Sequence, residues 1–228
     1  MRWLKDSLRR KPWARIGNET TSRVLRPVDA HILRLTEIGE LYWDAEHNSE
    51  QLTVHSDGRT IEWDQRKSTK ARLLPQWVPA STRLFLHSGE FSLDFRIDNM
   101  AGGQMGVGFL LQVTDGVEVG CDWGSFGYLG SSCTAWAYDP STGDLVTGTR
   151  SIEGDLPQCT EDNGHTIRLT VTVPRHRSGF ARFTIGGVDS HAIALPPGAV
   201  IVPAACLMSP GQRVTLMSFE MSPRRRSV

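Results

Sequence analysis

The chain has 228 residues, 39% of them hydrophobic and 22% charged, which is typical of a folded globular protein and excludes a disordered or fibrous one. Its formal net charge is zero, so nothing in the overall charge calls for a polyanionic partner. No apolar run approaches the ~20 residues of a membrane-spanning helix, and no stretch has the pattern of a secretory leader, so we expect an intracellular, cytoplasmic protein.

The charges are unevenly distributed along the chain. Residues 1–26 hold eight Lys and Arg against two Asp and Glu, and three arginines lie in the segment 224–226, which leaves 14 basic and 23 acidic side chains in residues 27–223. Basic ends are more often solvated tails than attachment points for an acidic surface, and the ends are the one part of the chain through which nucleic acid could bind. The Arg-rich start also resembles a mitochondrial presequence, which leaves a mitochondrial location as an alternative.

The first 40 residues differ in pattern from the rest. Trp3, Leu4 and Leu8 predict one face of a short helix that ends at Pro12, and residues 27–41 predict a second helix. We therefore expect a basic, helical or irregular N-terminal extension over residues 1–40.

From about residue 40 the sequence consists of short β-rich runs that mostly alternate apolar and polar residues. These runs are residues 40–43, 51–56, 59–63, 83–88, 91–98, 105–113, 134–138, 144–148, 166–173, 180–187 and 214–221. Turn residues separate them, such as Asp57-Gly58 and Gly186-Gly187. Many short strands at this spacing predict an all-β fold, an antiparallel β-sandwich, over residues 41–222, followed by a basic tail at 223–228.

Several separate stretches resemble the PRY-SPRY domain, and they occur in the order found in that family. "WDAEHNSEQLTVHSDGRTIEW" (43–63) is similar to the PRY half, and "LHSGEFSLDFRID" (86–98) and "MGVGF" (105–109) are similar to the start of the SPRY half. "TAWAYDPSTGDLVTG" (134–148), "FARFTIGG" (180–187) and "VIVPAACL" (200–207) match later segments. Two positions depart from the family: residues 163–168 replace a Gly-Asp-Val-Ile-Gly signature, and Val202 stands where a tyrosine is usual.

The resemblance implies a bent, concanavalin-like jelly-roll sandwich of the SPRY type that binds a peptide or a protein surface through loops at one end. The site residues that it implies are Trp123, Tyr128 and Leu129 in one loop, Arg66 after the PRY strand, and Met208 after the strand that holds Pro203. Each has a structural alternative: Tyr128 could pack within the core, and Arg66 lies in a charged run that is usually solvated. By the same resemblance Trp136 is core.

We expect no catalytic residue, no cofactor and no metal site. Glu118 and Asp122, and His165 with Asp162, lack the partners of a glycosidase or hydrolase site. Asp139 and Asp144 could bracket a calcium ion, although an ordinary turn explains them better. The four cysteines have no zinc-site spacing and are expected to be buried thiols.

The predicted function is a non-enzymatic protein–protein interaction module that serves as an adaptor or as a subunit of a larger assembly. The basic extension would then contact that assembly. The alternative is a sandwich protein that binds or cleaves carbohydrate.

Overall fold

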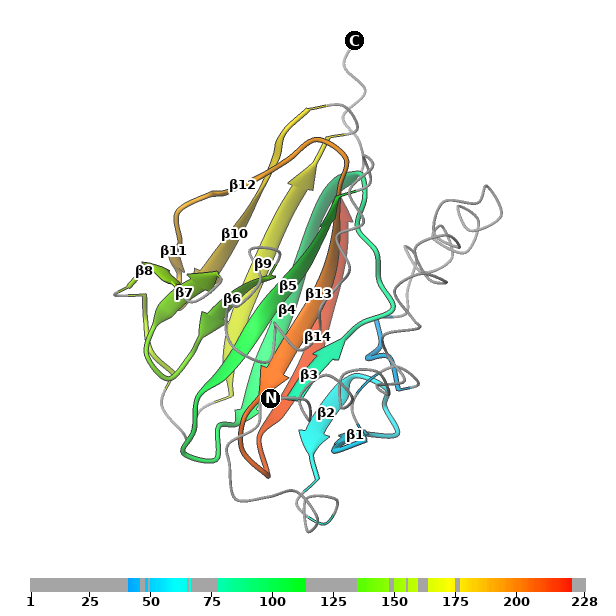
Figure 1. Ribbon diagram of the computed structural model, residues 1–228, viewed down its shortest axis with the longest axis vertical. Helices are drawn as coiled ribbons and strands as arrows, with labels where there is room; N and C mark the ends of the chain where they lie inside the picture. Colours follow the sequence, from blue (N-terminus) through cyan, green and yellow to red (C-terminus); the bar gives the residue numbers. More distant parts are fainter. Residues whose placement is uncertain are drawn as a thin grey trace, which may run out of the picture.

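The computed structural model describes residues 41–45, 48, 50–64, 66, 78–113, 135–147, 150–154, 156–159, 164–174 and 177–222. The described part contains strands and turns and no helix, and the strands form two antiparallel sheets that pack face to face (Figure 1). The predicted all-β sandwich is therefore confirmed. The expected N-terminal helices fall outside the described residues. No helix in the described ranges is long and apolar enough to cross a membrane.

The larger sheet has eight strands in the order β1-β2-β14-β4-β9-β10-β11, with β12 also paired to β10. Its strands are β1 (Leu52–Val54), β2 (Thr60–Trp63), β4 (Gly89–Asn99), β9 (His165–Val173), β10 (Gly179–Ile185), β11 (Val188–Asp189), β12 (Ile193–Leu195) and β14 (Arg213–Ser222). The smaller sheet has six strands in the order β3-β13-β5-β6-β7-β8. They are β3 (Val78–Ser81), β5 (Met105–Val113), β6 (Ala135–Asp139), β7 (Asp144–Thr147), β8 (Arg150–Glu153) and β13 (Ala199–Leu207).

The core lies between the two sheets and is filled by the alternate apolar residues that the sequence predicts. In β4 and β9 every second side chain is buried: Phe91, Leu93, Phe95 and Ile97, and Ile167, Leu169, Val171 and Val173. Phe109 of β5 stacks on Phe183 of β10 across the interior, with ring centroids 6.3 Å apart. Each such side chain contributes about 1.5–3 kcal/mol when it leaves water, so the two inner faces dominate the stability.

The outer face of the six-stranded sheet is also apolar. All nine residues of β13 are buried, and Val202, Ala204 and Cys206 belong to a second cluster on this face with Leu110 of β5. The outer face of the eight-stranded sheet is polar instead and carries the ion pair between Arg168 and Asp94.

Two predicted strands are wrong. Residues 83–88 alternate in burial as a strand would, but they cross from β3 in one sheet to β4 in the other, and their described pairing is one bridge from Leu86 to Ile201. In the predicted strand 40–43, the described residues 41–43 make a single bridge, from Trp43 to Thr82. Trp43 also donates a hydrogen bond from Nε1 to the Arg59 carbonyl at 2.7 Å, which fixes the β1–β2 turn.

Candidate functional site

One end of the sandwich is organised by a single buried amide, that of Gln212, whose side chain is fully inaccessible to solvent. Its Oε1 accepts hydrogen bonds from the backbone amides of Met208 and Ser209 at 2.6 and 3.0 Å. Its Nε2 donates to the carbonyls of Met100, Gly103 and Gln104 at 2.8, 3.1 and 3.0 Å. An amide has two N–H donors and one accepting oxygen, so this orientation uses both ends of the group.

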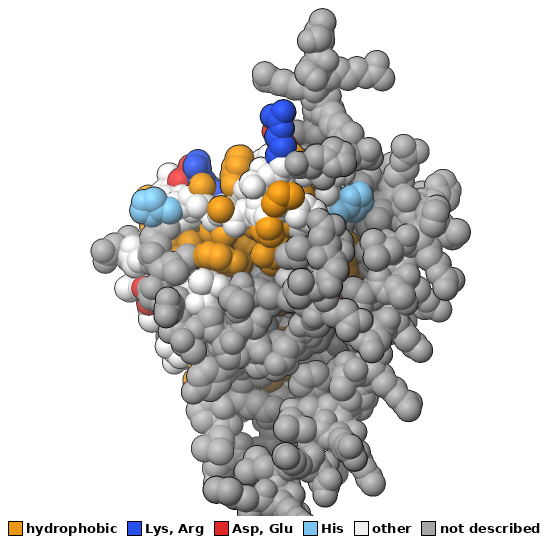
Figure 2. Space-filling model, turned by 45° about the horizontal axis from the view of Figure 1, so that its top comes forward, with side chains coloured by type: hydrophobic (Ala, Val, Ile, Leu, Met, Phe, Trp, Pro, Cys, Tyr) orange, Lys and Arg blue, Asp and Glu red, His pale blue; other side chains and the backbone are white. Residues whose placement is uncertain are grey.

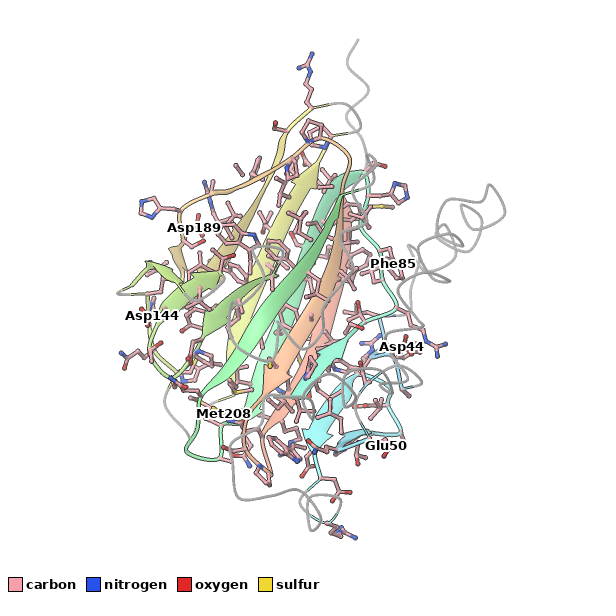
Figure 3. The ribbon with its side chains drawn as sticks, viewed as in Figure 1. Asp44, Glu50, Phe85, Asp144, Asp189 and Met208 are labelled. Carbon is pink, nitrogen blue, oxygen red and sulfur yellow. The ribbon has the colours of Figure 1, made fainter. Side chains whose placement is uncertain are left out.

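These bonds join the β4–β5 turn to the β13–β14 turn, and backbone bonds add the end of β2. The Trp63 amide donates to the Gln212 carbonyl at 3.0 Å, and the Gly211 amide donates to the Trp63 carbonyl at 2.9 Å. We call this region the loop end and define it as residues 64–66, 99–104 and 208–212, of which Gln65 is not described. It lies at the lower end of the molecule in Figures 1 and 3, where Met208 is labelled.

The β4–β5 turn is held in an uncommon conformation. Ala101 has a φ of 45°, the one positive φ among the described residues other than glycine. The amide of Ala101 donates to Asn99 Oδ1 at 2.9 Å, and Asn99 Nδ2 donates to the Gly211 carbonyl at 2.9 Å. A left-handed alanine costs on the order of 1 kcal/mol, so the surrounding bonds must hold the turn in one shape.

The structure brings two of the five predicted site residues together at the loop end. Met208 is half-buried and is the first residue of the β13–β14 turn. Arg66 is exposed just beyond β2, and its backbone amide donates a hydrogen bond to Asp64 Oδ1 at 2.9 Å. Trp123, Tyr128 and Leu129 lie outside the described residues. They follow β5 in the sequence. β5 begins at Met105, next to the loop end, and ends at Val113, far from it.

The sequence analysis missed Gln212. A glutamine after "SPG" looks like an ordinary solvated turn residue, because nothing in the local sequence shows that two other segments, the β4–β5 turn and the end of β2, converge on it. The alternation that starts at Val214 could have placed Gln212 on the buried side of the strand, as its even number matches Val214 and Leu216. That signal identifies burial but not its five hydrogen-bond partners.

The aromatic pair at 136 and 138 and the turn after it have a structural role. Trp136 packs half-buried against the core, as expected, and the buried Tyr138 hydroxyl donates to the Pro157 carbonyl. Burial raises the pKa of Tyr138, with smaller contributions from the neighbouring Cys159 and Asp139. The segment therefore packs one side of the sandwich.

Asp139 caps the turn that follows, as the sequence suggested. It is 2% exposed, and its Oδ1 accepts from the Ser141 amide at 2.9 Å and from the Ser141 hydroxyl at 2.7 Å. Burial raises the pKa of the Asp139 carboxyl above its ordinary range, and the nearby Asp144 raises it further, against the hydrogen bonds. Within the described ranges, no three His, Cys, Asp or Glu side chains gather as a metal set.

The pKa of a second carboxylate, that of Asp94, is shifted in the opposite direction, below its ordinary range. Arg168 donates to both of its oxygens, from Nε at 2.7 Å and from Nη2 at 2.8 Å, and the Ser218 hydroxyl donates at 2.7 Å. The Arg168 hydrogen bonds are the largest cause of the lowered pKa of Asp94, with burial acting against them. Asp94 is a charged structural partner and not a proton donor.

Both described cysteines are free and buried, as expected. Burial raises the pKa of the Cys159 thiol to about 11, and that of Cys206 is raised for the same reason. Neither thiol has the lowered pKa of a nucleophile. Cys121 and Cys133 lie outside the described residues.

No protein-family model and no curated protein matches the sequence. The fold is nevertheless similar to solved structures, among them the SPRY domain of human HERC1, with a TM-score of 0.53 at 15% identity over 77% of this chain and 97% of that chain. The PSpry domain of TRIM65 gives a TM-score of 0.51 at 8% identity over 84% and 98% of the two chains. The chain therefore has the SPRY-type fold that the motifs indicated.

Proposed function

We propose that this chain is a non-catalytic protein-interaction module that binds a peptide or a protein surface through the loop end. The observation that carries the proposal is the buried Gln212 side chain, which fixes the turns that present Met208 and Arg66. Rigid loops lose little conformational freedom on binding, so they bind more tightly than mobile ones. The SPRY-type fold supports the proposal, because SPRY domains serve as interaction modules.

The side chains at the loop end indicate the chemistry of the partner. Met208 presents an adaptable apolar side chain, and the exposed Arg66 presents a planar guanidinium of the kind enriched at interfaces. The partner segment would place an apolar side chain against Met208 and a carboxylate or carbonyl against Arg66.

The test is quantitative capture of proteins from a lysate of the source cells on the immobilised full chain. Met208→Glu and Arg66→Glu reverse the chemistry at the loop end without removing a hydrogen bond to the Gln212 side chain, because Met208 makes that bond with its backbone amide. Phe180→Glu is the matched control, since Phe180 is an exposed residue of β10 on the eight-stranded sheet. Proteins retained by the parent and the control but lost by both loop-end variants support the proposal, and equal retention by all four contradicts it.

A finer form of the proposal makes the chain a subunit of a larger assembly, with the basic residues 1–26 as an attachment arm. The eight basic against two acidic side chains there, and the acidic excess in residues 27–223, support it. Deleting residues 1–26 should weaken co-purification with the assembly while the melting temperature stays the same. Unchanged co-purification would contradict the role of residues 1–26 as an attachment arm, but it would not contradict binding through the loop end.

A further inference from the structure

The edges of the two sheets are mostly unsuited to pairing with another chain. β3 contains Pro79, which cannot donate to a neighbouring strand, and β12 has three residues and is followed by Pro196 and Pro197. β1 is equally short. Short strands and prolines are the usual means by which proteins prevent edge-to-edge association.

β14 differs from these strands. It pairs with β4 along its length to Ser222, but with β2 only over Arg213–Thr215. The Leu216 amide makes one more bond on the β2 side, to the Arg59 carbonyl at 2.9 Å. From Met217 onward, no described strand lies along that edge of β14. β14 begins at the loop end and runs to the opposite end of the molecule (Figure 1).

The exposed side chains on this edge are two methionines and one carboxylate, that of Glu220. Met217 is 40% exposed at a bulge in the pairing with β4, and Met221 is 42% exposed. Between them Phe219 is half-buried and stacks on Phe91, with ring centroids 6.0 Å apart. In Figure 2, which turns the top of the molecule to the viewer, the described surface shows hydrophobic side chains together with basic, acidic and histidine side chains.

The sequence of this edge is self-complementary. Met217-Ser218-Phe219-Glu220-Met221 has a methionine at each end and Phe219 in the middle. If two copies pair antiparallel about a two-fold axis through Phe219, each Met217 lies opposite Met221 of the second copy, and each Ser218 lies opposite Glu220. This register places apolar side chains opposite apolar ones and no charged side chain opposite a like charge. A two-fold interface requires such self-complementarity, because the same surface of each copy meets the other.

We propose that two copies of this chain dimerise edge to edge through residues 217–221 of β14, in this antiparallel register. The new strand pair joins the two eight-stranded sheets into one continuous sheet. The contact with β2 ends just before the bulge at Met217, so the stretch from Met217 to Met221 is the part that accepts the second copy. This interface is separate from the loop end, which remains accessible on both copies.

Sedimentation equilibrium of the full chain over a concentration series tests the proposal. The parent should associate reversibly toward twice the mass of one chain. Met217→Lys with Met221→Lys places ammonium groups opposite one another and should weaken association about tenfold or more, equivalent to about 1.4 kcal/mol. Met217→Lys with Met221→Glu sets opposite charges against one another in the same register and should restore dimerisation in a salt-dependent way.

Val188→Lys is the matched control, because Val188 is 47% exposed on β11 at the other edge of the sheet. It should leave the dimer unchanged, as should the loop-end variants Met208→Glu and Arg66→Glu. A parent that stays monomeric throughout the series overturns the proposal, even if β14 binds a strand from a different protein. Equal behaviour of the two double variants overturns the register.

Discussion

Gln212 Oε1 accepts the backbone N–H of Met208 at 2.6 Å, so the predicted contact residue is held in place by a side chain that never reaches the surface. The same amide donates to three carbonyls of the β4–β5 turn. The shape of the loop end therefore depends on one interior residue, whereas its recognition chemistry depends on exposed ones. Substitutions can separate these two roles.

Gln212→Ala should destabilise the protein and distort the loop end. It leaves two amides and three carbonyls without their partner, and each buried unsatisfied group costs about 1–3 kcal/mol before water or relaxation compensates. We expect a loss of about 3 kcal/mol or more in the free energy of unfolding, measured by urea denaturation. Gln104→Ala is the control, because Gln104 is exposed and contributes only its backbone carbonyl. A Gln212→Ala variant as stable as the control would show that the amide is not needed.

The ion pair of Asp94 with Arg168 should make the free energy of unfolding fall as the pH falls into the acid range. The pKa of Asp94 is lowered in the folded protein, so the unfolded chain takes up the proton first as the pH falls. The stabilisation is present above the unfolded pKa of about 3.9 and is lost as the pH falls through the folded pKa. The free energy of unfolding of the parent should exceed that of Asp94→Asn at neutral pH, and the difference should shrink in acid. A difference that does not change with pH would contradict this account.

Asp139 should show the reverse dependence. Its pKa is raised in the folded protein, so the unfolded chain loses the proton first as the pH rises. The resulting cost is absent below the unfolded pKa of about 3.9 and is complete above the folded pKa. Asp139→Asn keeps an oxygen for the two bonds from Ser141 and removes the charge, so it should be more stable than the parent at pH 7 and similar to it in acid.

Glu50→Gln is the control for Asp139→Asn, because it neutralises an exposed carboxylate. Urea denaturation of the three proteins at several pH values gives the comparison. Loss of stability in Asp139→Asn at pH 7 would show that the carboxylate charge itself supports the turn.

Gly108→Ala should be among the most damaging small substitutions in the chain. A Cβ at Gly108 would lie 2.0 Å from the Trp136 carbonyl oxygen and 2.8 Å from the Ala137 Cα, both backbone atoms of the neighbouring β6. The strands must separate to admit it, and we expect a cost of about 3 kcal/mol or more. Gly187→Ala meets no atom within 4 Å and is strained only by its φ of 83°, so it should cost about 1 kcal/mol. Equal melting temperatures for the two variants would contradict the close approach of the β5 and β6 backbones at Gly108.

The sequence predicts the strands whose two faces differ. Phe91, Leu93 and Phe95 alternate with polar residues because one face of β4 meets the core and the other meets water, and the structure confirms that pattern. In β13 the alternation fails, because both faces are buried, and only the resemblance to a known segment indicated a strand there. β3, β8, β11 and β12 were missed because two to four residues carry too little periodicity.

The candidate site was less predictable than the fold. Arg66 and Met208 were placed through the family resemblance, and the structure brings them to one end. Gln212 could not be assigned its role, because three of its five partners come from the β4–β5 turn, more than a hundred residues away in the chain. Tyr128, Leu129 and Trp123 remain predictions, since they lie outside the described residues.

Hydrogen–deuterium exchange of the full chain, with and without a captured partner, tests the central claim most directly. Binding at the loop end predicts slower exchange of amides in residues 99–104 and 208–212, with little change in β9 and β10. Protection confined to other segments, with the loop-end amides exchanging as in the free protein, would contradict the claim that this end recognises the partner.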